Sequence, residues 1–149
     1  MMLRWLLAAA HLLALAIGMG SVWVRARALR GPLDEAGLRR VFAADSLWGV
    51  AGALWIATGL WRLLAGTEKT TAYYLGSPVF WLKMGALVTL LVLEVVAVVA
   101  LIGWRQQVRR GIPVDVARAP VLARLSEVQA LLVVVMVLAA TAMARGLGT

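Results

Sequence analysis

The residues with the most chemical potential in this sequence are polar side chains set within or at the ends of long apolar runs. They comprise one histidine, two basic residues and three acidic residues, namely His11, Asp45, Arg62, Lys83, Glu94 and Glu127. A histidine can bind a metal ion or a haem iron, and a carboxylate away from water can carry a proton or pair with a cation. The role open to each depends on the elements that position it.

Four apolar runs dominate the chain. Of its 149 residues, 63% are hydrophobic, whereas soluble domains contain roughly 45–50% apolar residues. Helical runs of this length match the ~30 Å hydrocarbon core of a bilayer. We therefore predict an all-α, up-down bundle of four membrane-spanning helices over residues 3–24, 41–64, 80–104 and 125–144, forming a single domain over 1–149. The first run resembles a signal peptide, but it continues past the small-residue cleavage pattern, so we expect it to be retained as a span.

Basic residues gather between the apolar runs and give a net charge of +8. Ten of the fifteen lie on the side of the first and third connections. The positive-inside rule then places both termini on the non-cytoplasmic side of a bacterial inner membrane. Such loops contact anionic headgroups, so we expect membrane lipid as a partner and no nucleic acid, with a homo-oligomer left open. The absence of cysteine excludes disulfides and thiolate sites.

Small residues at four-residue spacing favour close helix packing in lipid. The first span has Ala10, Ala14 and Gly18, and the second has Gly49, Ala53 and Ala57, with Asp45 one turn earlier. We predict that these two stripes meet. The last two spans are rich in valine and leucine, so we expect them to lack such a stripe and to pack more loosely.

The predicted topology sorts the polar residues into levels. His11, Arg62 and Lys83 fall near the side of the termini, Glu94 falls near the middle, and Asp45 and Glu127 fall near the cytoplasmic side. Lys83 and Glu94 are eleven residues apart, which returns to nearly the same helix face about 16 Å further along. We expect this face to point into the bundle.

Each polar residue also has a structural interpretation. Lys83 and Arg62 can extend to the headgroups. Asp45 and Glu127 can cap the starts of their helices, and His11 can bond a neighbouring helix. Glu94 is the hardest to explain in this way, because a carboxylate at mid-membrane should be protonated or paired with a cation.

Four sequence runs resemble a known family. They are Asp45-Ser-Leu-Trp-Gly, Thr58-Gly-Leu-Trp-Arg62, Glu68-Lys69 followed by Tyr73-Tyr74-Leu75, and Pro78-Val-Phe-Trp-Leu-Lys83-Met-Gly. They are similar to an uncharacterised bacterial membrane family, domain of unknown function 2214, over essentially the whole chain. This resemblance implies a membrane protein and no particular activity.

A fainter resemblance links the chain to four-helix bacterial protoporphyrinogen oxidases and to copper-resistance-type membrane domains. In the oxidases, a first-helix histidine and a lysine near the start of the third span are implicated in haem binding, and His11 and Lys83 would match them. The oxidases carry further histidines around later helices, whereas this chain has a single histidine.

We therefore expect a structural or interaction bundle, and two alternatives stay open. One is a porphyrin or haem b protein with a redox role, in which His11 binds the iron and Arg62 and Lys83 meet the propionates. The sixth ligand would be Met84 or Met143, or would be absent. The other is a small-ion or proton pathway that uses Glu94. An enzyme of the soluble type is not expected, because the sequence shows no nucleophile–base pair, metal cluster or phosphate-binding loop.

Overall fold

A computed structural model describes residues 2–65 and 70–147 of the protein. Four long helices make up almost all of it: α1 (Met2–Arg30), α2 (Glu35–Leu64), α4 (Pro78–Arg109) and α5 (Ala119–Ala144). A short helix, α3 (Thr71–Leu75), precedes α4, and the described residues contain no strand. All four long helices are long and apolar enough to cross a membrane. The predicted all-α, four-span fold is confirmed.

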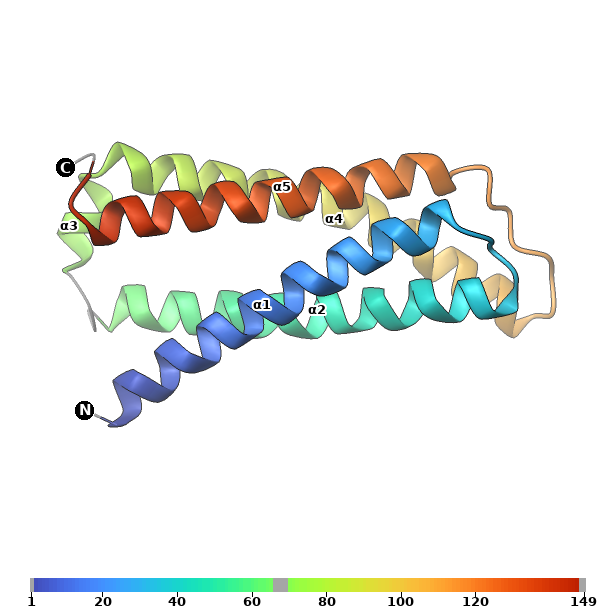
Figure 1. Ribbon diagram of the computed structural model, residues 1–149, viewed down its shortest axis with the longest axis horizontal. Helices are drawn as coiled ribbons and strands as arrows, with labels where there is room; N and C mark the ends of the chain where they lie inside the picture. Colours follow the sequence, from blue (N-terminus) through green and yellow to red (C-terminus); the bar gives the residue numbers. More distant parts are fainter. Residues whose placement is uncertain (1, 66–69, 148–149) are drawn as a thin grey trace.

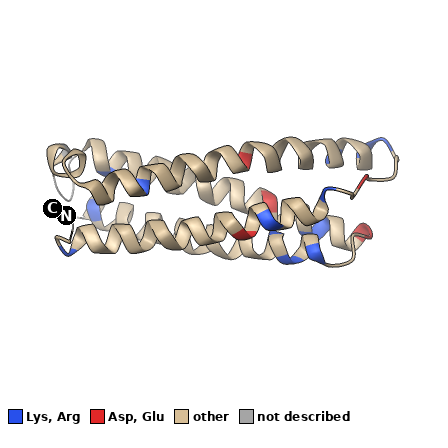
Figure 2. Cartoon of the chain, turned by 90° about the horizontal axis from the view of Figure 1, so that it is seen from above, with Lys and Arg blue, Asp and Glu red and all other residues tan. Residues whose placement is uncertain are grey.

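Consecutive long helices run in opposite directions, so the bundle has two distinct ends (Figure 1). The connections 31–34 and 110–118 lie together at one end, which we call the loop end. Both termini and α3 lie at the opposite end, which we call the terminal end. Charged residues are concentrated toward the loop end, and fewer lie along the rest of the helices (Figure 2).

The helices extend further into polar sequence than the predicted spans do. α1 continues past Val24 to Arg30, and α2 begins at Glu35, where the Asp34 side chain accepts a hydrogen bond of 2.8 Å from the Gly37 amide. The apolar runs mark only the lipid-embedded part, because arginine is a good helix former and lets a helix continue beyond it. Arg25 and Arg105, which the sequence suggested were at or beyond the span ends, consequently lie within α1 and α4.

α1 is the central packing element, since it contacts both α2 and α5, and α4 packs on α5. Buried residues of α1 and α2 extend toward the terminal end only as far as Ala14 and Trp55. Those of α4 and α5 reach Phe80 and Met143, close to the terminal end. The loop half is therefore closely packed, whereas in the terminal half the α1–α2 pair diverges from the α4–α5 pair (Figure 1).

The predicted contact between two small-residue stripes is wrong for the second span. Gly18 is buried, and a Cβ atom there would lie 3.4 Å from the Trp48 ring and 3.6 Å from Ala51. Gly49 is exposed and has no such neighbour within 4 Å. A strict four-residue spacing rotates about 40° per step around a helix. The α2 interface instead alternates steps of three and four residues, through Ala44, Trp48, Ala51 and Trp55.

The expectation that the last two spans lack a small-residue stripe is wrong for the last of them, whose helix begins earlier than the predicted span. The buried face of α5 carries small side chains over its first three turns, namely Ala119, Ala123, Ser126 and Ala130. Their spacing of four, three and four residues keeps them on one face. This face allows α5 to contact both α1 and α4.

Candidate functional site

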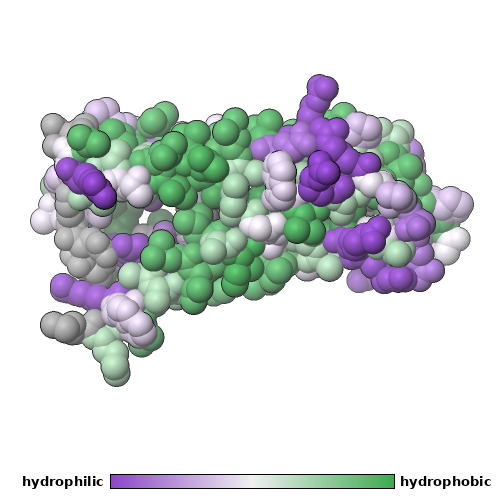
Figure 3. All heavy atoms as spheres, in the orientation of Figure 1, coloured by the Kyte–Doolittle hydropathy of each residue, from purple (hydrophilic) through white to green (hydrophobic). Residues whose placement is uncertain are grey.

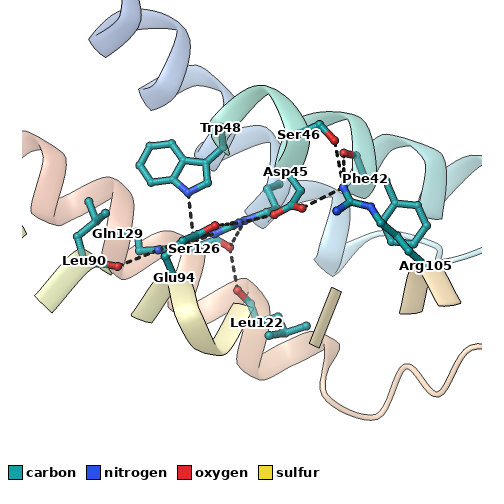
Figure 4. Close-up of polar contacts among 11 residues, drawn as sticks. Phe42, Asp45, Ser46, Trp48, Leu90, Glu94, Arg105, Leu122, Ser126 and Gln129 are labelled. Carbon is teal, nitrogen blue, oxygen red and sulfur yellow. Dashed lines mark hydrogen bonds and ion pairs between the residues drawn. The ribbon is translucent and has the colours of Figure 1, made fainter. Parts of the chain in front are cut away.

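Arg25 lies at the centre of a polar network inside the loop half of the bundle, and Figure 4 labels the residues that surround it. Its side chain is 0% exposed. Nη1 donates to Asp45 Oδ1 at 2.8 Å and to Glu94 Oε1 at 3.1 Å. Nη2 donates to Glu94 Oε2 at 2.9 Å and to Gln129 Oε1 at 2.6 Å, and Nε donates to Ser126 Oγ at 3.0 Å. A guanidinium has five N–H groups, so these five contacts satisfy all of them.

The two carboxylates of this network have further donors. Asp45 Oδ2 lies 3.0 Å from Nη2 of Arg105, the second arginine of the network. Glu94 Oε2 accepts hydrogen bonds from Trp48 Nε1 at 2.9 Å and from Gln129 Nε2 at 2.8 Å. We call this set the Arg25 network; its members are Arg25, Asp45, Trp48, Glu94, Arg105, Ser126 and Gln129. Two guanidinium groups and two carboxylates give it no net formal charge.

The Arg25 network joins all four long helices through one side chain. Arg25 belongs to α1, Asp45 to α2, Glu94 to α4, and Ser126 and Gln129 to α5. An unpaired charge at the centre of a membrane costs about 2.5–3.5 kcal/mol on insertion scales. Because the charges and donors of the network are matched, its geometry suits a permanent cross-connection between spans.

The structure decides between the interpretations of the three acidic residues. Glu94 is paired with a cation, Arg25. The capping interpretation is wrong for Asp45 and Glu127, because α2 and α5 begin several residues earlier than the predicted spans, at Glu35 and Ala119. Glu127 instead forms a two-point ion pair with Arg30, at 2.6 and 2.8 Å, near the loop end.

Sequence reasoning missed the role of Arg25, although a signal for it exists. Ala14, Gly18 and Ser21 are buried on one face of α1 with spacings of four and three residues. A further step of four along this face reaches Arg25. If the stripe is extended by alternating steps of four and three residues, it does not end at Val24 but continues to Arg25. This pattern would have placed the arginine inside the bundle. Ser126 and Gln129 lie within the predicted last span, but their pairing with Arg25 required knowledge of which helices are neighbours.

His11 belongs to a second polar site in the terminal half. Its Nδ1 atom lies 2.9 Å from Thr58 Oγ1 on α2, and its ring centroid lies 5.8 Å from that of Trp55. The Thr58 hydroxyl donates to the Leu54 carbonyl oxygen at 2.7 Å. Its oxygen is therefore the acceptor toward His11, which assigns the ring proton to Nδ1. His11 thus connects α1 to α2, as its structural interpretation predicted.

Arg62 and Lys83 lie within electrostatic range of His11, so the structure brings these three residues into one region. Lys83 is half-buried on α4, as is Glu94 further along the same helix. Within residues 2–65 and 70–147, Lys83 forms neither a hydrogen bond nor an ion pair. The same residues contain no group of three or more His, Cys, Asp or Glu side chains able to hold a metal ion.

One edge of the His11 ring is closed by α2. A Cβ atom on Gly59 would lie only 3.2 Å from His11 Cε1, so the edge of the ring that includes Cε1 faces the α2 backbone. This contact leaves no room for a bulky group between the Cε1 edge of His11 and α2. A cavity lined by Gly18, Trp48 and Trp55 has a volume of about 10 Å³, room for about one water molecule.

Comparison with known families accounts for the chain as a whole. The model of DUF2214, a family described as predicted membrane proteins, matches residues 3–148. The chain belongs to the DUF2214 family. This confirms the resemblance carried by the runs around Asp45 and Lys83, and the chain is a membrane protein of this family with four candidate spans. No curated protein and no solved structure gives a significant match.

Proposed function

We propose that this protein is a structural or interaction bundle of the bacterial inner membrane, and not an enzyme or a carrier. The observation that carries the proposal is the fully buried Arg25, whose five N–H groups contact side chains from the three other spans. Removing one partner from a buried ion pair costs about 3–5 kcal/mol, because the other charge stays buried. Such a network favours one arrangement of the helices, which suits a scaffold.

The outside of the bundle suits contact with lipid and with other membrane helices. All four spans expose large apolar side chains, among them Leu13, Leu54, Val92 and Leu131. The apolar surface covers the middle of the molecule, and hydrophilic residues gather at the loop end (Figure 3). In the proposed role, lipid covers most of this apolar surface. Where the bundle acts as a scaffold, a second copy of this protein or another membrane protein replaces part of the lipid.

The contacts of Glu94 support a scaffold over a proton pathway. Four N–H groups point at its carboxylate, from Arg25 Nη1, Arg25 Nη2, Trp48 and Gln129. To pass a proton along a pathway, Glu94 would have to release several of these donors at each cycle. Each donor belongs to a neighbouring span, so the release would require the spans to move apart.

Two measurements on the purified protein test the proposal. In liposomes with an imposed membrane potential and an enclosed pH dye, wild type should leak protons no faster than protein-free liposomes. Glu94→Gln should lower the thermal unfolding midpoint in detergent strongly, by an amount consistent with about 3–5 kcal/mol. Glu35→Gln is the matched control, because Glu35 is an exposed partner of Arg39, and such pairs contribute about 0–1 kcal/mol. Proton flux that wild type shows and Glu94→Gln loses would contradict the scaffold.

A further inference from the structure

The terminal half of the bundle contains an opening between the two helix pairs. Beyond Ala14 in α1 and Trp55 in α2, no residue of these helices toward the terminal end is buried. α4 and α5 stay packed as far as Phe80 and Met143. The space-filling view shows the resulting hollow between the pairs near the terminal end, with hydrophilic atoms visible inside it (Figure 3). The Arg25 network lies outside this region, in the loop half.

Positive charge accumulates in the same half. Lys83 lies five residues from the start of α4, or about 8 Å along the helix. It is half-buried, and another cation, Arg62, lies within electrostatic range of it. His11 adjoins both. The described acidic residues lie elsewhere: Asp45 and Glu94 belong to the Arg25 network, Glu127 pairs with Arg30, Glu35 pairs with Arg39, and Asp34 and Asp115 lie in the loop-end connections.

A half-buried ammonium group without an acceptor is costly in a membrane protein. The cost falls when an anion arrives from outside the chain and pairs with the ammonium group. The nearby turns of α1 and α2 expose large apolar side chains such as Leu6 and Leu64, and both helices are candidate membrane spans, so lipid can reach this region. An occupant therefore needs a negative group at the level of Lys83 and an apolar body along the helices.

We propose that this opening binds an anionic phospholipid, whose headgroup phosphate contacts the Lys83 ammonium beside Arg62. The acyl chains lie against the apolar turns of α1 and α2 where these helices diverge from α4 and α5. Charge complementarity selects the anionic headgroup, and the membrane-facing position of the opening selects a lipid over a dissolved anion. The lipid would close the part of the bundle that the protein core leaves open.

Native mass spectrometry of the delipidated full-length protein tests this site. Phosphatidylglycerol should form a one-to-one adduct that survives activation energies at which phosphatidylcholine dissociates. Lys83→Gln should weaken phosphatidylglycerol binding about tenfold, as expected for the loss of one charge-assisted contact, and Lys83→Arg should retain it. Arg39→Gln is the control, because it removes one exposed positive charge at the other end of the molecule and should leave the adduct unchanged.

A stability measurement keeps the test decisive if Lys83→Gln folds poorly. Lys83→Met removes the unpaired charge, so it should unfold at or above the wild-type temperature in phosphatidylcholine. Phosphatidylglycerol should then raise the unfolding temperature of wild type but not that of Lys83→Met. Three results would each overturn the proposal: equal binding of the two lipids, equal weakening by Lys83→Gln and Arg39→Gln, or displacement of phosphatidylglycerol by excess inorganic phosphate. None of them depends on the scaffold role.

Discussion

Trp48 and Trp55 lie seven residues apart on the buried face of α2 and differ mainly in what their indole N–H groups meet. Trp48 donates a hydrogen bond of 2.9 Å to Glu94. Trp55 Nε1 is buried and has no hydrogen-bond partner among the described residues. A buried donor without a partner costs about 1–3 kcal/mol. The indole N–H group therefore contributes to stability at Trp48, whereas at Trp55 it is a buried donor without an acceptor among the described residues.

The substitutions Trp48→Phe and Trp55→Phe isolate this difference. Both remove an N–H group and a similar volume, but only the first removes a bond to a carboxylate. We expect Trp48→Phe to lower the free energy of unfolding by about 1–3 kcal/mol more than Trp55→Phe does. Thermal unfolding in detergent, followed by circular dichroism, measures both. Equal losses of stability in the two variants would show that the indole N–H of Trp48 contributes nothing to the network.

At the residue scale, the sequence could predict the need for a partner but not its identity. A carboxylate at mid-membrane requires neutralisation, so Glu94 could be expected to meet a cation. Arg25 was the partner, and its position directly after an apolar run made it look like a loop residue that orients the chain. The shared region of His11, Arg62 and Lys83 followed from the alternating directions of the spans. The contact between His11 and Thr58 did not, because it depends on helix rotation.

At the element scale, helix rotation decides which glycines matter. The number, type and order of the helices follow from the apolar runs, since each run must satisfy its backbone hydrogen bonds within itself in lipid. The buried face is harder to predict, because a valine-rich helix can face either lipid or protein at similar cost. Gly18 and Gly49 show the consequence: both belong to predicted stripes, but only Gly18 lies in an interface.

Leucine at these two positions tests the observed rotation of α1 and α2. Gly18→Leu places its branched side chain against the Trp48 ring and Ala51, whose atoms already lie within 3.6 Å of the Cβ position. We expect overpacking to cost about 1–3 kcal/mol of unfolding free energy. Gly49→Leu points into open space and should change stability by no more than about 0.5 kcal/mol. A larger loss at Gly49 than at Gly18 would mean that α2 presents its other face to α1.

At the scale of the whole molecule, polarity is divided between two halves with different properties. The loop half contains the neutral Arg25 network and close packing, and the terminal half contains the opening beside Lys83, which has no hydrogen bond or ion pair among the described residues. The arginines inside the network cannot orient the chain by binding cytoplasmic headgroups. Among the described residues, when Arg25 and Arg105 are set aside, eight basic residues remain toward the loop end against four toward the terminal end. The bias still favours a cytoplasmic loop end, but by less than the sequence count suggested.

Single cysteines can determine this orientation, because the natural chain has none. Leu147 at the terminal end and Ile112 at the loop end are both well exposed. A membrane-impermeant maleimide should label Leu147→Cys in right-side-out vesicles and Ile112→Cys only in inverted ones, and detergent should make both reactive. The reverse pattern would place the termini in the cytoplasm. With the expected pattern, Lys83 lies toward the outer leaflet, and the phospholipid of the opening must come from that leaflet.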